Sequence, residues 1–349
     1  MAIPSIDEIF LFAVKHKASD IHLIADLPPI VRIDGILQRI PSMPTLTKEN
    51  VKTLCVSILN EKQKEKYETE RELDVSYEIK DTSRFRVNLH WEKENAGLVA
   101  RVVSNDIPTM EELLMPPIVY DLLDLSQGLI LVTGPTGCGK STSLAAMIES
   151  LNNKRNANII TLEDPIEFIY EPKKSIIRQR QLGSDMLSFP EGLKHVLRQD
   201  PNIILVGEMR DLETIAATIT LAETGHLVLA TLHTLNAAQS IDRIIDVFPP
   251  YQQSQVRLQL SLFLRGIISQ LLLPQINGGR VASREVLINT PAISNLIREN
   301  KVHQIKTAIQ TSHEEGMMTM DQSLKQMYQN NLITREVAIA HMNNPNLLD

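Results

Sequence analysis

The chain has 349 residues, of which 43% are hydrophobic, so it is long enough for about two domains with buried cores. Its 35 Lys and Arg against 42 Asp and Glu give a formal net charge of −7, which argues against general electrostatic binding to nucleic acid or anionic lipid. Two cysteines, Cys55 and Cys138, are too few for a disulfide framework or a four-cysteine zinc site, and they fit a reducing, cytoplasmic compartment.

The first part of the chain, 1–105, is predicted to be a small mixed domain of helices and strands. Apolar residues at helical spacing indicate a helix at 6–17. Its apolar run is too short to span a bilayer, and no basic region precedes it as in a signal peptide. Alternation of apolar and polar residues predicts strands at 20–24, 28–35, 84–89 and 97–103.

A connector marked by prolines, 106–119, is predicted to join this domain to a second one at 120–349. Beyond the connector, short unbroken apolar runs alternate with helical patterns, which is typical of a parallel sheet covered on both faces. These runs lie at 129–133, 158–162, 203–206 and 227–231. We therefore predict an α/β fold for the second domain.

A glycine-rich loop follows the first of these runs and matches the pattern G-x-x-x-x-G-K-[ST]. It consists of Gly134, Pro135, Thr136, Gly137, Cys138, Gly139, Lys140, Ser141 and Thr142. Its glycines let several backbone amides converge on a phosphate, and the helix that begins near Lys140 adds the positive end of its dipole. We predict that the loop binds ATP, that Lys140 reaches the β- and γ-phosphates, and that the Ser141 hydroxyl ligates Mg²⁺.

Cys138 lies within this loop and has two interpretations. It is either a small filler, tolerated because the backbone does the binding, or a reactive thiol whose pKa is lowered by Lys140 and the loop amides. The second interpretation predicts that a maleimide labels Cys138 and that ATP slows the labelling.

Hydrolysis needs a carboxylate that orients or deprotonates water, and two strand ends supply candidates. The sequence Thr-Leu-Glu-Asp-Pro-Ile-Glu at 161–167 follows an apolar run. Glu163 and Asp164 are therefore expected at the carboxyl edge of the sheet, where ligands bind in open α/β folds. Because Asp-Pro is also a typical helix start, we interpret Asp164 as structural and Glu163 as functional.

The second strand end is the block Gly-Glu-Met-Arg-Asp at 207–211. An apolar strand that ends in an acidic residue downstream of a phosphate loop is a Walker B pattern, here with Gly207 where an aspartate often stands. Glu208 is expected at the same edge as Glu163 and is the candidate for orienting water. The alternative is a solvated glutamate at a strand end.

Two histidines, His226 and His233, bracket the apolar run at 227–231. Their odd separation prevents both side chains from lying on one face of a regular strand, so we do not expect the pair to chelate a metal. His233 follows the carboxyl end of the run and is the better candidate for sensing the γ-phosphate through a hydrogen bond.

The end of the chain is predicted to be mostly helical from about 280 to 349. Before it, a Leu/Ile-rich segment at 258–273 is interrupted by Arg265, so we predict a buried amphipathic helix there. No segment of the sequence predicts a membrane span. Contact with a membrane is therefore expected only through a partner or at its surface.

The four blocks at 134–142, 161–167, 207–211 and 225–234 occur in an order that resembles the secretion ATPase superfamily, most closely the type IV pilus retraction ATPases of the PilT family. Segments at 19–23, 28–35, 84–88 and 290–299 are also similar to that family, so the resemblance covers nearly the whole chain. It implies a homohexameric motor. Each subunit would have an N-terminal PAS-like domain, a RecA-like P-loop ATPase domain and a helical C-terminal appendage.

The resemblance also implies roles for individual residues. Glu208 would be the general base or position water, and Glu163 would belong to the metal and water network. His226 and His233 would sense nucleotide. Arg86 and Arg101 match the family's N-terminal arginines, which reach the phosphates and neutralise developing charge. Without the resemblance, both would be interpreted as ordinary solvated arginines on strands.

The family further implies a location and partners. The motor would lie at the cytoplasmic face of the inner membrane, act on a membrane platform protein and, through it, remove pilin during pilus retraction and twitching motility. With two cysteines the chain is expected to have neither the four-cysteine element nor the extra N-terminal domain of extension and secretion relatives, which favours the retraction group. Ser294 stands where the family's retraction motif usually has arginine, Asn202 where it commonly has aspartate, and Cys138 where it commonly has serine.

Three alternatives remain open. The chain could be an accessory, extension or secretion ATPase of a related inner-membrane machine. It could be a regulator that binds nucleotide but hydrolyses little. A RecA-like nucleic-acid motor would need a basic channel and stacking aromatic residues, and the net charge of −7 and the 14 aromatic residues weigh against it.

Overall fold

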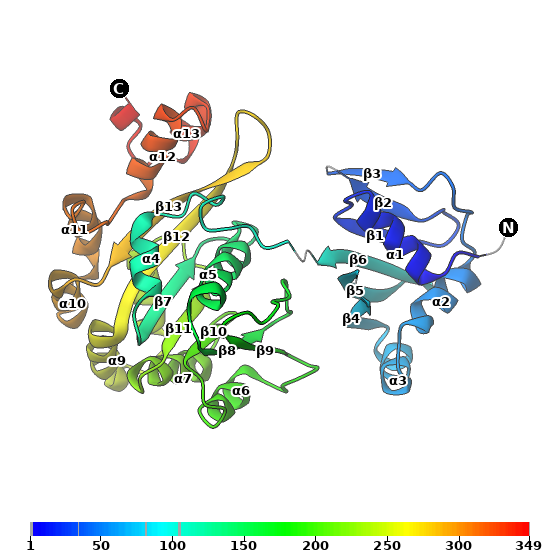
Figure 1. Ribbon diagram of the computed structural model, residues 1–349, viewed down its shortest axis with the longest axis horizontal. Coiled ribbons are helices and arrows are strands. Elements are labelled where there is room, and N and C mark those ends of the chain that lie inside the picture. The colour runs from blue at the N-terminus through cyan, green and yellow to red at the C-terminus, as the bar shows by residue number, and fades with distance from the viewer. Residues whose placement is uncertain (1–2, 34, 81, 104–105, 349) are drawn as a thin grey trace. The chain divides into compact units, whose positions relative to one another are not determined.

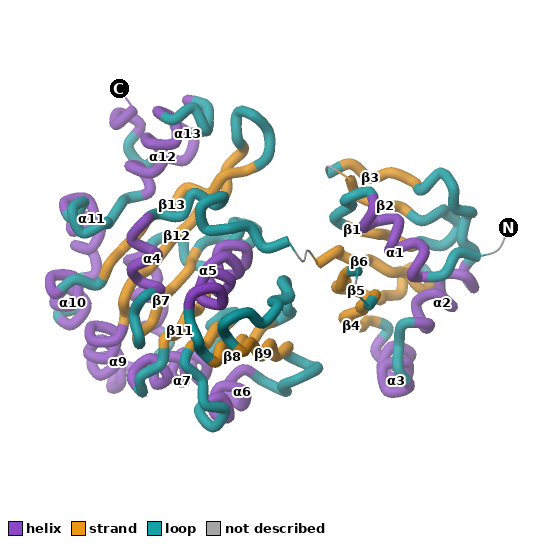
Figure 2. Tube along the Cα trace, in the orientation of Figure 1, coloured by secondary structure: helices purple, strands orange, loops and turns teal. Residues whose placement is uncertain are grey.

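The computed structural model describes residues 3–33, 35–80, 82–103 and 106–348. The chain divides into two compact units (Figures 1 and 2). The first comprises Met1–Asp106 together with Glu167–Ile169, and the second comprises Ile107–Ile166 and Tyr170–Asp349.

The first unit is built on an antiparallel six-stranded sheet with the order β3-β2-β1-β6-β5-β4. Its strands are β1 (Asp20–Leu23), β2 (Ile30–Ile33), β3 (Ile36–Arg39), β4 (Glu72–Ile79), β5 (Ser83–Glu92) and β6 (Asn95–Val103). Its helices are α1 (Ile6–Lys15), α2 (Lys48–Ser57) and α3 (Glu61–Glu70). All three helices begin with a capping box, in which two side chains satisfy amides that the first turn leaves free. Apolar side chains from the helices and the strands form one hydrophobic core.

The two faces of this sheet differ, because side chains alternate along each strand. On β5, Phe85 and Val87 are buried in the core, whereas Arg86 between them is exposed. The strand register places Arg86 directly opposite Arg101 of β6, which in turn lies opposite Asp20 of β1. One face therefore packs on the helices while the other carries a row of charged side chains.

Some elements of this unit match the sequence predictions and others do not. The predicted helix at 6–17 corresponds to α1, and the predicted strands at 84–89 and 97–103 lie within β5 and β6. Strands β3 and β4 and helices α2 and α3 were not predicted. Helix α3 shows why, since Tyr67 is its single buried residue and no apolar stripe marks the helix in the sequence.

The second unit is built on a seven-stranded sheet with the order β13-β12-β7-β11-β10-β8-β9. Neighbouring strands are parallel except for the antiparallel pair β12–β13. The strands are β7 (Gly128–Thr133), β8 (Asn158–Glu163), β9 (Ile176–Gln181), β10 (Ile203–Val206), β11 (Leu227–Leu232), β12 (Leu264–Pro274) and β13 (Arg280–Ile288). Every residue of β7, β10 and β11 is buried, as expected for strands covered on both faces. The predicted α/β fold is confirmed.

Helices surround the strands of this unit (Figure 2). They are α4 (Pro117–Leu123), α5 (Lys140–Lys154), α6 (Phe189–Val196), α7 (Leu212–Glu223), α8 (Ala237–Asp246), α9 (Pro250–Phe263), α10 (Pro291–Arg298), α11 (Ile305–Thr311), α12 (Met320–Gln329) and α13 (Arg335–His341), with short 3-10 helices at Val302–Gln304 and Pro345–Leu348. Helices α12 and α13 lie beside the β12–β13 hairpin, with which they share a small separate core (Figure 1). Within the described ranges, no helix is both long and apolar enough to cross a membrane.

One sequence prediction about the second half of the unit was wrong, and another is confirmed except at its start. The segment at 258–273 is not one buried helix, because α9 ends at Phe263 and β12 begins at Leu264. The region from about 280 to 349 is mostly helical as predicted, from α10 onward, but it starts with strand β13. A continuous apolar run does not distinguish a buried helix from a buried strand. The signal that was overlooked is the pair Gly278–Gly279, both with positive φ, which turns the chain between β12 and β13.

Candidate functional site

The phosphate loop, Glu163, Glu208 and His233 gather where four parallel strands end. Strand β7 ends at Thr133, which pairs with Leu232 at the end of β11. Strand β10 pairs in the same way with β8, whose last residue is Glu163. The phosphate loop and the residues that follow β8, β10 and β11 therefore share one edge of the sheet, the edge at which open α/β folds bind ligands.

The loop at 134–142 depends on its glycines for its shape. Gly134 has φ +141°, and a Cβ there would lie 2.4 Å from the Gln270 carbonyl oxygen and 2.6 Å from Cys138 Sγ. Gly139 (φ +87°) precedes the first residue of α5, and no side chain in the described part of the chain caps that helix. The first amides of α5 therefore remain available to an anion.

Lys140 lies across the mouth of this loop. Its ammonium group is buried and donates hydrogen bonds to the carbonyl oxygens of Gly134 (2.8 Å) and Pro135 (3.1 Å). These two bonds hold the positive charge of Lys140 beside the amides of the loop, where it can contact a bound phosphate. The free amides of α5 and the ammonium group of Lys140 fit the phosphates of a nucleotide. The oxygen of the Ser141 hydroxyl, in the first turn of α5, fits a magnesium ion bound with it.

Glu208 is connected to the phosphate loop through His233. The side chain of Glu208 is 13% exposed, and its Oε2 lies 3.1 Å from His233 Nε2. The other ring nitrogen of His233 lies 3.5 Å from Thr136 Oγ1 in the loop. Arg210 Nε forms an ion pair with Glu208 Oε1. Burial, with the nearby charges of Lys140 and Arg210, lowers the pKa of His233, so the neutral imidazole bridges carboxylate and loop near neutral pH.

Glu163 is held at the end of β8 by hydroxyl and amide donors. Its Oε1 accepts hydrogen bonds from Thr161 Oγ1 (2.6 Å) and from Gln179 Nε2 of β9 (3.3 Å). A Cβ at Gly207 would lie 2.9 Å from the Leu162 carbonyl oxygen. This close approach between the ends of β8 and β10 explains the glycine at 207 and brings the backbones that carry Glu163 and Glu208 together.

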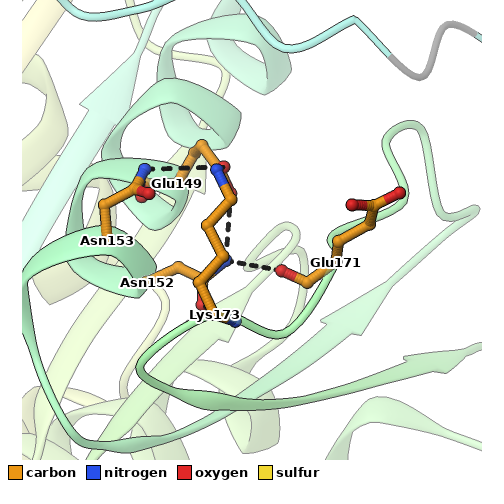
Figure 3. Close-up of polar contacts among 5 residues, drawn as sticks. All are labelled: Glu149, Asn152, Asn153, Glu171 and Lys173. Carbon is orange, nitrogen blue, oxygen red and sulfur yellow. Dashed lines mark hydrogen bonds and ion pairs between the residues drawn. The ribbon is translucent and has the colours of Figure 1, made fainter.

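Asp164 does not start a helix, which corrects the interpretation of the Asp-Pro pair. The Asp164–Pro165 peptide bond is cis, and the next regular element is strand β9. The segment between β8 and β9 is instead fastened to the far end of α5 (Figure 3). There the buried Asn152 donates to the Glu171 carbonyl oxygen (2.8 Å) and accepts from the Lys173 amide (3.0 Å). Lys173 Nζ also pairs with Glu149. The helix that starts at the phosphate loop thus also holds the segment that follows Glu163.

His226 lies at the other edge of the sheet. It precedes β11, and its carbonyl oxygen accepts a hydrogen bond from the amide of Gly128, the first residue of β7. Its Nδ1 lies 3.0 Å from the Leu221 carbonyl oxygen and 3.2 Å from Thr224 Oγ1 at the end of α7. Of the two predicted histidines, the structure brings His233 to the phosphate loop of its own chain but not His226.

The interpretation of Cys138 as a thiol with a lowered pKa was wrong. The side chain is buried, and this burial raises the pKa of the thiol despite the nearby charge of Lys140. The structure supports the other interpretation, that Cys138 is a small filler packed against Gly134.

Arg86 and Arg101 belong to the first unit, whereas the phosphate loop belongs to the second. The side chain of Arg101 is 69% exposed, and its Nε donates to Asp20 Oδ1 at 3.0 Å. Although burial acts against it, hydrogen bonds from Ser19 and Arg101 hold the pKa of Asp20 below its ordinary value. Arg86 and Arg101 lie directly opposite each other on neighbouring strands, and such a pair of like charges is unfavourable on its own. The position of both arginines on one exposed face suits a site for an anion.

A polar layer that was not predicted from the sequence lies behind the phosphate loop. Gln270 of β12 is 1% exposed, and its Nε2 donates to the Cys138 carbonyl oxygen at 2.7 Å. Ser143 of α5 and Arg284 of β13 continue this layer. The available signal was a glutamine within an apolar run, because a buried amide needs hydrogen-bond partners.

Comparison with known proteins supplies several relatives along almost the whole chain. The family described as Type II/IV secretion system protein matches residues 1–339. The type IV pilus retractation ATPase PilT of Pseudomonas aeruginosa is 50% identical over 333 residues, which cover 95% of this chain and 96% of the relative. The type IV pilus ATPase PilU of the same organism is 40% identical over 341 residues, covering 97% and 89%. A crystal structure of the pilus retraction motor PilT with bound ADP covers 99% of both chains at 45% identity, with a TM-score of 0.93.

Proposed function

This chain is an ATPase of the PilT family, within the Type II/IV secretion system proteins, and we propose that it works as a homohexameric motor that powers retraction of type IV pili. The resemblance indicated by the four sequence blocks is confirmed. The observation that carries the proposal is that two groups lie at the same edge of the sheet. One is the phosphate loop, which leads into helix α5 without a side-chain cap, and the other is the carboxylate of Glu208, which His233 links to the loop. That arrangement provides both nucleotide binding and a group to act on water.

The proposal assigns a task to each group at this edge. The loop amides and Lys140 bind the phosphates of ATP, and Ser141 and Glu163 hold Mg²⁺. Mg²⁺ supplies positive charge that offsets the negative charge of the phosphates. Glu208 orients water or accepts its proton, and the neutral His233 reports occupancy of the loop to Glu208 through Thr136.

The two units have separate tasks in this proposal. The second unit is a RecA-like ATPase domain with a helical appendage, and the first is a PAS-like domain. Arg86 and Arg101, on the exposed sheet face, reach the phosphates and neutralise charge as the bond to the γ-phosphate breaks. Within the predicted connector at 106–119, the first unit ends at Asp106 and the second begins at Ile107, and this junction lets the first unit move as nucleotide turns over.

The motor is proposed to lie at the cytoplasmic face of the inner membrane. Its partners are other copies of the chain, a pilus platform protein in that membrane and, through this protein, pilin. The names of the relatives support this assignment, since one is a type IV pilus retractation ATPase and another a type IV pilus ATPase. Deletion in the source organism, followed by imaging of surface filaments, tests it. Accumulated pili support retraction, whereas absent pili indicate extension.

A second candidate, an accessory ATPase of the same machinery, is favoured by Ser294. Its hydroxyl donates to the Ser261 carbonyl oxygen of α9 at 2.5 Å, so position 294 joins two helices and carries no charge. Ser294→Arg separates the two candidates. Unchanged twitching in the variant would favour a full retraction motor, and increased twitching would favour the accessory role.

The catalytic part of the proposal is tested by Glu208→Gln, which keeps the shape of the side chain and removes its charge. We expect ATP turnover to fall by about 10²-fold or more while ADP still binds, because a general base typically contributes that much. Glu213→Gln, in the first turn of α7, is the matched control. Turnover near zero in the wild type as well would contradict the motor and favour a nucleotide-binding regulator. Light scattering that finds a monomer with and without nucleotide would contradict the ring.

A further inference from the structure

Arg284 is a buried charge to which the proposed catalytic steps assign no task. It lies on β13 with 2% of its surface exposed. Among the described residues it takes part in no ion pair, and its Nε has no hydrogen-bond partner. Burying an ion without an opposite charge is unfavourable, so a side chain of this kind calls for a specific reason.

One end of the guanidinium group connects to the phosphate loop. Arg284 lies directly opposite Gln270 in the β12–β13 pair (labelled in Figure 1). Its Nη2 lies 3.5 Å from Ser143 Oγ, which donates to Gln270 Oε1 at 2.9 Å. Gln270 Nε2 then donates to the Cys138 carbonyl oxygen at 2.7 Å. Three side chains from three elements therefore form one chain of hydrogen bonds that ends on the backbone of the loop.

The other end connects to the turn at 109–115, which lies within the predicted connector. Arg284 Nη1 donates to the carbonyl oxygens of Leu113 (2.9 Å) and Leu114 (3.2 Å). Leu114 has φ +50°, a conformation that a bulky side chain rarely adopts. The turn also has a capping pair, Thr109 with Glu112. Leu114 thus adopts this strained backbone conformation at the point where the buried guanidinium of Arg284 binds its carbonyl oxygen.

We propose that Arg284 is a positioning residue that couples the phosphate loop to the connector. Through Ser143 and Gln270 it holds the Cys138 carbonyl in the conformation that binds nucleotide, and through Leu113 and Leu114 it ties that conformation to the docked turn at 109–115. The inference rests on the proposed function only in taking the ligand to be a nucleotide. Coupling between sites is reciprocal, so nucleotide in the loop stabilises the turn and an undocked turn weakens nucleotide binding.

The first test is equilibrium binding of a fluorescent ADP analogue with Mg²⁺ to the full chain. Ser143→Ala interrupts the hydrogen-bond chain without removing a charge, and Arg284→Met removes the guanidinium group with similar bulk. We expect each to raise the Kd about tenfold, and the double variant to raise it no further, because both cut the same connection. Ser283→Ala is the matched control. It removes a buried hydrogen bond to Ser323 on the other face of β13 and should leave the Kd unchanged.

The second test is amide hydrogen exchange in a peptide covering 109–116. Added ADP should slow exchange there in the wild type and in Ser283→Ala, but not in Arg284→Met. If Arg284 had a purely structural role, Arg284→Met would lower the unfolding temperature but leave the slowing of exchange by ADP at 109–116 intact.

Three outcomes separate the possibilities. If the wild type binds ADP and folded Arg284→Met binds it equally well, or shows the same response at 109–116, the inference is overturned. If Arg284→Met does not fold, Ser143→Ala decides alone, and an unchanged Kd in that variant overturns the inference. If the wild type binds no ADP, the proposed function fails, and the inference fails with it.

Discussion

The two sheets of the molecule place their polar side chains in different ways. In the first unit, alternate residues of β5 and β6 leave the core, so Arg86 and Arg101 lie on an exposed face. In the second unit, β7, β10 and β11 are buried on both faces, so Glu208 and His233 lie where strands end. A half-covered sheet can carry functional groups anywhere on one face, whereas a fully covered sheet confines them to an edge.

The largest effect is expected at the edge, from Lys140→Ala. Lys140 bridges two carbonyl oxygens of the phosphate loop, and an alanine supplies neither that contact nor a charge for the phosphates. We expect nucleotide binding or turnover to fall to background, as measured by ADP titration and phosphate release. Lys154→Ala, at the other end of the same helix, should keep turnover within about twofold, because surface substitutions usually have small effects. Normal turnover in Lys140→Ala would show that the edge is not the site.

The next largest effect is expected from substitutions on the exposed face of the first unit. Arg86→Ala and Arg101→Ala should each slow ATP turnover by about 10³-fold while weakening ADP binding much less, because these charges are proposed to act as charge develops on the phosphates. Arg84→Ala is the control, since Arg84 lies two residues from Arg86 on the same face of β5. Equal losses in all three variants would indicate a general effect of positive charge. Normal turnover in both Arg86→Ala and Arg101→Ala would remove the face from the site.

The same contrast explains which parts of the site the sequence predicts. Strands buried on both faces appear as unbroken apolar runs, so their ends, and with them Glu163, Glu208 and His233, could be located from the pattern. A polar residue on a half-covered sheet looks like any solvated residue, so Arg86 and Arg101 were identified only through the family resemblance. The contact of Gln270 with Cys138 spans 132 residues of sequence and comes from a strand that the pattern suggested was helical. Local periodicity does not encode such a pairing.

A smaller effect is expected from a substitution at Asn152, which holds the segment that follows β8 at the carboxyl edge of the second sheet. Asn152 is fully buried and satisfies both the Glu171 carbonyl oxygen and the Lys173 amide. Asn152→Ala leaves both groups without this partner and should lower the free energy of unfolding by about 1–3 kcal/mol, the usual cost of a buried unsatisfied polar group. Urea denaturation measures this loss. Asn153→Ala removes exposed hydrogen bonds on the same helix and should change stability much less. Equal losses would show that the segment after β8 does not depend on Asn152.

The smallest expected effect is a pH dependence that isolates His233. Burial, together with Lys140 and Arg210, lowers the pKa of His233 below its ordinary value of 6.5. The unfolded chain therefore takes up a proton on this imidazole at a higher pH than the folded chain. The stability that the neutral imidazole contributes is complete above pH 6.5 and is lost as the pH falls through that value toward the lower folded pKa.

Unfolding temperatures of the wild type and His233→Gln between pH 8 and pH 5 measure this contribution, since the other titrating groups largely cancel in the difference. The advantage of the wild type should be largest at pH 8 and shrink below pH 6.5. Arg210→Met should make this pH-dependent loss smaller, because removing one positive charge that opposes protonation, and freeing Glu208 to favour it, raises the pKa of His233 in the folded chain toward 6.5. A difference between wild type and His233→Gln that stays constant with pH would contradict a neutral His233 between Glu208 and the phosphate loop. The edge would then consist of a loop and a carboxylate without a link between them.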